Sequence, residues 1–184
     1  MSHDESPLRG KLLLSVPALM DPNFRHTVVL LAEHAGHGAV GVILNRPSDI
    51  TVAWGAAPLA DLVEPDAPLH EGGPVSPNTA VLLVEVADPA LLDLPVRGSI
   101  GIVTGEIDDD LRRHILRARV FAGHAGWGPT QLEAELTEGS WILEDPTPDD
   151  IFSPNPDTLW QDILRRKGPP WDRMARVPFD LRSN

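Results

Sequence analysis

The chain of 184 residues contains no cysteine. This absence excludes disulfide bonds, thiolate zinc sites and cysteine nucleophiles. No apolar run approaches the roughly 18 residues of a membrane-spanning helix, and residues 1–7 hold no apolar segment typical of a secretory signal. We therefore expect a cytoplasmic protein with no membrane partner. A single domain of this length buries roughly 70% of its unfolded surface without needing a disulfide or a metal.

Basic residues are also few, with 15 Lys and Arg against 27 Asp and Glu, and the formal net charge is −12. Such a charge repels nucleic acid and anionic membranes at long range. The basic residues nevertheless gather in two clusters, at 112–119 and 165–176. Runs of this kind are more often the solvated faces of surface helices. We expect direct nucleic-acid binding to be absent or weak, with a DNA-binding regulator as an alternative.

Short segments rich in Leu, Val and Ile predict β-strands rather than helices. The connection at 34–38 is short and contains two glycines, so the strands on either side of it are expected to form an antiparallel hairpin. A twisted mixed sheet of about six strands follows. The predicted strands are 11–16, 27–33, 39–44, 79–86, 100–104, 119–122 and 141–143.

Three helices are predicted from caps and apolar spacing. One runs from Asp108 through Ala118, a second from Thr130 to a stop at Gly139, and a third from Asn155-Pro156 to Gly168. Strands that come mostly first and helices that come later indicate an α+β fold, a single domain with about three flanking helices. We place this domain at 10–172, with a flexible terminus at 1–9 and a tail at 173–184.

The most specific stretch of the sequence is Gly123 to Glu133, which reads GHAGWGPTQLE. Its three glycines permit positive φ angles or close approach of another backbone. Thr130 and Glu133 have the spacing of a capping box, which begins a helix. The stretch therefore predicts a strand that turns into a helix, with Trp127 buried beneath that helix as an anchor.

This stretch, with Glu135 and Gly139-Ser140-Trp141 after it, resembles the signature of the YqgE/AlgH family of small bacterial proteins. The resemblance implies the fold of that family, whose members are uncharacterised or described as transcriptional regulators, and it brings no catalytic residues. His124 stands where an aromatic residue is expected, and Thr130 where glycine is usual. Further blocks in the same order are Gly10 to Leu14, Pro17, Asp21-Pro22, Phe24, Gly38 to Gly41, Asn45-Arg46-Pro47 and Gly72 to Val75.

No motif for catalysis, metal binding or cofactor binding is complete. The segment around Ser99 has the wrong spacing for a nucleophile elbow. The glycines at 123, 126 and 128 lack the order of a dinucleotide loop and the Lys of a P-loop. His34 and His37 belong to no recognised set of metal ligands. We expect no catalytic residue, no metal and no cofactor.

The remaining polar, aromatic and glycine positions of the blocks are candidates for contact with a small ligand or a protein partner. The guanidinium of Arg46 suits a carboxylate or phosphate, but it suits equally a role in tying down a loop through carbonyl groups. The leading hypothesis is a non-enzymatic binding protein with an indirect link to transcription. An enzyme with a pocket near Asn45, Arg46, Gly72 and Gly73 is the alternative. The candidate residues are Asp21, Phe24, Asn45, Arg46, Gly72, Gly73, Gly126, Trp127 and Gln131.

Overall fold

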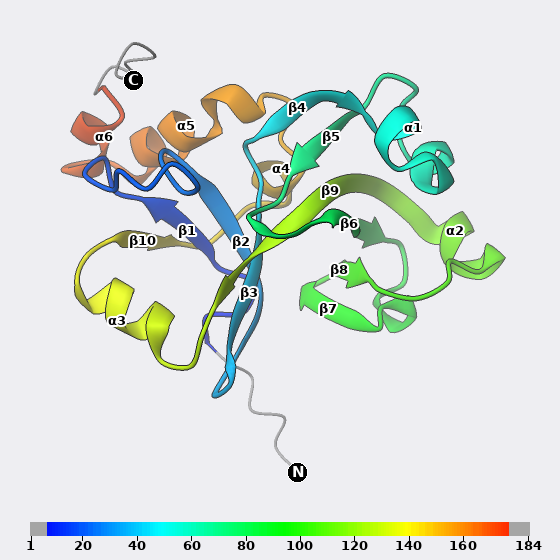
Figure 1. Cartoon of the computed structure of the whole chain (residues 1–184), viewed down its shortest axis with the longest axis horizontal. Helices are drawn as coiled ribbons and strands as arrows, with labels where there is room; N and C mark the ends of the chain where they lie inside the picture. The colour runs from blue at the N-terminus through cyan, green and yellow to red at the C-terminus, as the bar shows by residue number, and fades with distance from the viewer. Residues whose placement is uncertain (1–6, 177–184) are drawn as a thin grey trace.

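The computed structural model describes residues 7–176, which form one α+β domain around a strongly curved sheet of ten strands (Figure 1). The main path of the sheet runs β10-β1-β2-β3-β9-β6-β8-β7, and β5 joins β4 to β9. All pairs are antiparallel except β5 with β9, so the sheet is mixed, as predicted. The strands are β1 (Leu12–Ser15), β2 (Val28–Ala35), β3 (Gly38–Ile43), β4 (Pro47–Thr51), β5 (Pro68–Glu71), β6 (Val75–Val86), β7 (Leu94–Arg97), β8 (Ile100–Val103), β9 (Ile115–Trp127) and β10 (Trp141–Glu144).

The helices are short and lie around the edges and faces of the sheet. In Figure 1, α3 lies beside β10 at one end of the molecule, and α1 and α2 lie at the other. The expected count of three is too low for the described residues, because several single turns were not recognisable in the sequence. The helices are α1 (Val52–Gly55), α2 (Asp109–His114), α3 (Gln131–Thr137), α4 (Pro148–Ile151), α5 (Leu159–Lys167) and α6 (Trp171–Met174), with 3-10 turns η1 (Ala57–Leu62), η2 (Pro89–Leu91) and η3 (Pro156–Thr158).

The hairpin expected between the second and third strands is confirmed. β2 pairs antiparallel with β3, and the register runs from Val29 opposite Ile43 to Ala35 opposite Gly38. A bulge lies between Leu31 and Glu33. The hairpin extends the sheet from β1 to β9, and its two strands provide one wall of the candidate site.

The helix predicted from Asp108 to Ala118 is wrong in its second half. Asp108 does cap it, since its carboxylate accepts a hydrogen bond of 2.8 Å from the Leu111 N–H. The helix ends at His114, however, and the following residues belong to β9. Arg117 lies opposite Glu85 of β6 and forms a 2.5 Å ion pair with it. Pairing across the sheet therefore overrides a local apolar spacing that a helix also satisfies.

The capping box predicted at Thr130 is also wrong. Thr130 adopts a left-handed conformation with φ of 63°, and its side chain makes no capping hydrogen bond. Just before the helix, the side-chain oxygen of Gln131 accepts a 3.0 Å hydrogen bond from the Gly128 N–H. Glu133 instead contacts His34 at 2.6 Å. The left-handed conformation explains why glycine is favoured at position 130, and here threonine bears the strain.

The third helix follows the prediction. The turn η3 begins at Pro156, α5 continues from it, and Gly168 ends it with φ of 81°. The indole N–H of Trp160 donates a 2.9 Å hydrogen bond to the Ser15 carbonyl, which ties α5 to β1. The expectations for the two termini fall largely on residues 1–6 and 177–184, which lie outside the described residues.

The two faces of the sheet carry separate apolar clusters. The inner, concave face holds the main core, where leucines of β1 and β2 meet α4, α5 and α6. The outer face holds two smaller clusters. One contains Trp127, Leu132 and Trp141 beneath α3, and the other packs Val84 and Val120 against η1 and α2. The alternation of side chains along the strands separates these faces, apart from the bulges.

Candidate functional site

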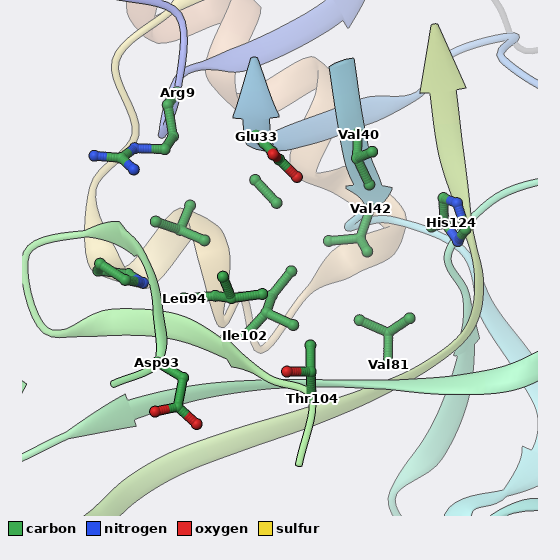
Figure 2. Close-up of a pocket in the computed structure, with 13 residues that line it drawn as sticks. Arg9, Glu33, Val40, Val42, Val81, Asp93, Leu94, Ile102, Thr104 and His124 are labelled. Atoms are coloured by element: carbon green, nitrogen blue, oxygen red, sulfur yellow. The ribbon is translucent and has the colours of Figure 1, made fainter. Parts of the chain in front are cut away.

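A pocket with largely apolar walls opens on the inner face of the sheet and has a volume of about 620 Å³. Figure 2 shows side chains of β3, β6 and β8 that face one another across it. Val40 and Val42 come from β3, Val81 from β6 and Ile102 from β8. Pockets of this size and apolar character are typical of small-molecule sites.

The curvature of the sheet makes this pocket. The last strand of the path, β7, returns to lie beside β2, so Leu94 and Val96 close the wall opposite Val42. The backbone at Gly10 packs against β7 so closely that an added Cβ would lie 2.7 Å from the Val96 carbonyl oxygen. That contact places Arg9 at the pocket.

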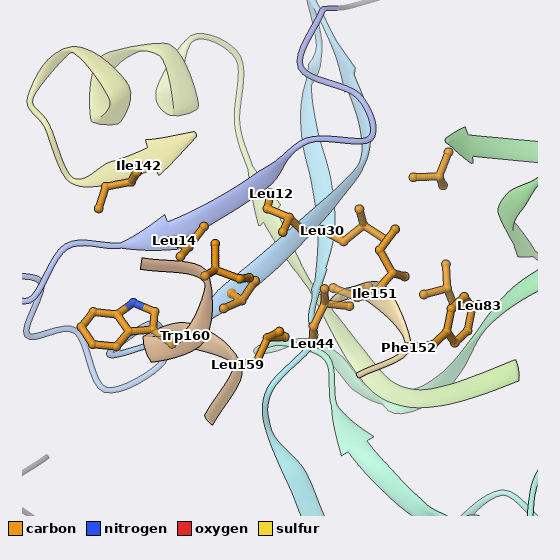
Figure 3. Close-up of a cluster of buried hydrophobic side chains, with 14 of the residues drawn as sticks. Leu12, Leu14, Leu30, Leu44, Leu83, Ile142, Ile151, Phe152, Leu159 and Trp160 are labelled. Atoms are coloured by element: carbon orange, nitrogen blue, oxygen red, sulfur yellow. The ribbon is translucent and has the colours of Figure 1, made fainter. Parts of the chain in front are cut away.

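The floor of the pocket is the main core, shown in Figure 3. Val42 and Val96 belong to both, and Val81 and Ile102 pack against the core from the pocket side. Helices α4, α5 and α6 cover the remainder of the inner face through residues such as Trp160. The pocket is therefore the part of the inner face that these helices leave uncovered.

Polar groups lie among the apolar walls at the pocket. They are Arg9, Glu33, Asp93, Thr104 and His124, of both charge signs. His124 reaches the pocket because Gly123 has a positive φ of 74° and shifts the alternation of β9. His124 departs from the family pattern, but it was not one of the residues predicted to contact a ligand.

Phe24 and Trp127, two of the predicted contact residues, lie in the outer cluster and not in the pocket. Trp127 is 5% exposed and stacks on Phe24 with ring centroids 6.0 Å apart. Trp141 meets both rings edge-on. The indole N–H groups of Trp127 and Trp141 donate to the same carboxylate oxygen of Glu135, each at 2.9 Å. Trp127 is thus buried under α3, as predicted.

Asp21, Asn45 and Arg46 brace the loop between β1 and β2. Asn45 accepts a 2.9 Å hydrogen bond from the Val28 N–H and donates one of 2.8 Å to the His26 carbonyl. Asp21 accepts one of 2.9 Å from the N–H of Asn23.

Arg46 donates to the backbone carbonyls of Pro22, Asn23 and Arg25. Burial lowers the pKa of Arg46, and the carboxylates of Glu71 and Asp21 oppose that shift. The sequence allowed Arg46 either to bind a carboxylate or phosphate or to tie down a loop. These hydrogen bonds support the second role.

The backbone at Gly72 and Gly73 lies very close to the backbone of strand β9. An added Cβ on Gly72 would lie 2.2 Å from the Gly123 carbonyl oxygen, and one on Gly73 would lie 2.2 Å from the backbone of His124. Gly73 and Arg46 line a smaller pocket of about 270 Å³. Gly126 pairs with Val40 within the sheet.

The nine predicted residues are therefore not gathered in one site. Five of them make their contacts within the fold: Asp21, Phe24, Asn45, Trp127 and Gln131. The walls of the large pocket were missed, since Val42, Val81 and Ile102 have the pattern of ordinary core strands. Only the three-dimensional arrangement reveals that no helix within residues 7–176 covers them.

The two basic clusters are largely neutralised by ion pairs. Arg112 pairs with Asp61, and Arg117 pairs with both Glu85 and Asp149. In the second cluster Arg166 makes a two-bond contact with Asp150 at 2.9 and 2.7 Å, and Lys167 lies 3.0 Å from Glu144. Neither cluster presents an unopposed cationic face from these residues.

Comparison with known proteins identifies the class to which this fold and these motifs belong. The AlgH-like family model (DUF179) matches residues 12–172, and the chain belongs to this family. A UPF0301 protein of Streptomyces avermitilis is 41% identical over 186 residues, which cover 97% of this chain and 96% of that protein. Another, CT0663 of Chlorobaculum tepidum, is 36% identical over 92% of this chain and 91% of its own length.

Two solved structures share the fold. A crystal structure of a protein from Corynebacterium diphtheriae aligns with a TM-score of 0.82 at 28% identity, covering 96% of this chain and 95% of that one. The solution structure of AlgH from Pseudomonas aeruginosa aligns with a TM-score of 0.68 at 26% identity, covering 96% and 98%. Within residues 7–176, no helix has the length and apolar character needed to cross a membrane.

Proposed function

We propose that this AlgH-like protein is a non-enzymatic binding protein for a small, mainly apolar ligand, held in the pocket on the inner face of the sheet. The single observation that carries the proposal is the pocket of about 620 Å³ walled by Val40, Val42, Val81 and Ile102. Burying an apolar ligand there gains about 25 cal/mol for each Å² removed from water. The ligand is expected to carry a polar group that meets Arg9 or His124, which lie on opposite sides of the pocket in Figure 2.

A binding role is favoured over catalysis by the character of the pocket. Most of its walls are Val, Leu, Ile, Pro and Ala side chains, which offer no nucleophile. Its two carboxylates, those of Glu33 and Asp93, lie on opposite sides of the pocket in Figure 2 and form no catalytic pair. The alternative enzyme pocket near Asn45, Arg46, Gly72 and Gly73 is weakened, because Arg46 donates to three backbone carbonyls. We place the protein in the cytoplasm, and any effect on transcription would act through a protein partner.

The proposal is tested by filling the pocket. Val81→Phe adds a ring to the pocket wall, and binding of an apolar fluorophore such as Nile red is expected to weaken by at least about tenfold, corresponding to about 1.4 kcal/mol. Val75→Phe is the matched control, because it makes the same change in the same strand at a side chain that is 41% exposed. The control variant should bind the fluorophore as the natural protein does.

Denaturant unfolding of each variant separates loss of the pocket from loss of the fold. The expected result is a folded Val81→Phe protein that no longer binds. Equal binding by both folded variants would place the fluorophore elsewhere and would contradict the proposal. Turnover of a bound ligand to a new product, followed by mass spectrometry, would contradict the non-enzymatic part alone.

A further inference from the structure

A third cavity, of about 250 Å³, lies between the β5 region, β9 and the loop after α4. His70 of β5 and Arg119 of β9 line it, with Ser153, Pro154 and Pro156 from the loop. Its lining has no residue in common with the pocket on the inner face described above. Nothing in the proposed function makes use of it.

His70, which lines both this cavity and the smaller pocket beside Arg46, has an unpartnered ring nitrogen. The residue is 2% exposed, and its ring packs against Phe121 with centroids 5.6 Å apart. Its Nδ1 lies 3.3 Å from the Pro68 carbonyl oxygen, which places the ring proton on Nδ1. Among the described residues, the buried Nε2 has no hydrogen-bond partner. A polar atom left in this state costs free energy.

Arg119 presents an unpartnered donor in the same cavity. Its Nη2 donates a 2.9 Å hydrogen bond to the Ser153 carbonyl, whereas its buried Nη1 has no partner within residues 7–176. Arg117, two residues away, pairs with Glu85 and Asp149, but no carboxylate of the described chain forms an ion pair with Arg119. Its charge is therefore desolvated without a matching anion.

We propose that this cavity is a binding site for a compact oxyanion, the carboxylate or phosphate group of a small ligand, held by Arg119 and His70. The guanidinium supplies the charge and a donor at Nη1. An oxygen near Nε2 makes the imidazolium form favourable, so His70 takes up one proton from solvent as the anion binds. Both unpartnered nitrogens then become donors to the same group.

The electrostatics of the site agree with this assignment. Burial and, second to it, the positive charge of Arg119 together lower the pKa of His70 to about 4. An anion between the two reverses the second effect. The charged residues that line this cavity with His70 are Arg119 and the exposed Glu64, and those that line the smaller pocket with it are Arg46 and Glu71. Glu64 opposes an anion, and Glu64→Gln is expected to tighten binding.

The test is a calorimetric titration of the full chain with inorganic phosphate, methyl phosphate and acetate, in non-coordinating buffers of differing ionisation enthalpy. At pH 7 the expected result is saturable binding of at least one of these anions with uptake of up to one proton. Arg119→Gln should weaken binding by about tenfold or more, as for loss of a charged hydrogen bond. Arg117→Gln is the matched control, with the same charge change on the same strand outside the cavity, and should bind nearly as the natural protein does.

Two further variants keep the result decisive if Arg119→Gln fails to fold. Arg119→Lys keeps the charge but loses the planar fork, and His70→Gln should abolish the proton uptake while leaving weakened binding. Comparison of the three anions then assigns a phosphate ester, free phosphate or a carboxylate. No saturable binding of any of them, or equal binding by the Arg119 variants and the Arg117 control, would overturn the proposal. Either result leaves the proposed function of the apolar pocket unaffected, since the linings of the two cavities share no residue.

Discussion

The indole nitrogen of Trp127 donates a 2.9 Å hydrogen bond to the carboxylate of Glu135, so the last residue of β9 is held by the helix that follows it. Trp141, the first residue of β10, donates to the same oxygen at the same distance. One carboxylate therefore joins the end of a strand, a helix and the start of another strand. This network gives the most specific sequence motif an architectural role.

The first prediction concerns Trp127. Trp127→Ala is expected to lower the free energy of unfolding by about 3 to 5 kcal/mol, since it removes a buried ring that stacks on Phe24. Trp127→Phe keeps an aromatic ring but loses the hydrogen bond to Glu135, so its loss should be smaller. Urea unfolding measures both. A loss below about 1 kcal/mol for the alanine variant would show that Trp127 is not an anchor.

The second prediction separates the two glutamates of α3. Glu135→Ala leaves two largely buried indole N–H groups without their acceptor and should cost about 1 to 3 kcal/mol. Glu135→Gln retains an acceptor oxygen and should cost less. Glu133→Ala, on the same helix but exposed, is the control and should change stability little. Equal losses at 133 and 135 would contradict the role assigned to Glu135.

The third prediction follows from the lowered pKa of His70, about 4 in the folded protein against about 6.5 when unfolded. Between these values the unfolded chain binds a proton that the folded chain does not, so this residue destabilises the fold as pH falls from about 6.5 to 4. The full effect is about 3 kcal/mol and is absent above about pH 7. His70→Gln should remove it, as unfolding in buffers free of phosphate and carboxylate will show. An unchanged pH dependence in the variant would refute this assignment.

The fourth prediction is that the protein does not bind duplex DNA with sequence preference at physiological salt. Net charge is −12, and Arg112, Arg117 and Arg166 are engaged with carboxylates. A salt-titrated binding assay is expected to show only weak association. Tight and selective binding that is lost in the Arg112→Gln, Arg113→Gln, Arg117→Gln triple variant would restore the DNA-binding alternative.

The strands β2 and β3 and the second half of β6 were recognisable from sequence, because consecutive apolar side chains there are buried on both faces of the sheet. The strands β4, β5 and β7 were missed, since each is only four or five residues long and contains proline. The helix predicted through Ala118 failed because of pairing with a distant strand. Residues 115–118 pair with β6, a contact that local spacing does not encode.

The sites were harder to predict than the fold. Arg46 was correctly seen as capable of tying down a loop, but sequence gave no means to choose between that and ligand binding. His70 and Arg119 are 49 residues apart in the chain and meet only because β5 pairs with β9 beside Phe121. The apolar pocket depends on the return of β7 to β2, which follows from sheet curvature and not from any motif.

The central claim is that the inner-face pocket binds an apolar ligand, and methyl NMR with a medium-chain fatty alcohol tests it most directly. The account predicts saturable shifts confined to methyl groups of Val40, Val42, Val81, Leu94 and Ile102, with the methyls of Leu132 and Val84 on the outer face unchanged. Shifts spread over the exposed Leu116 and the outer face, or no saturable shift at the pocket, would contradict it.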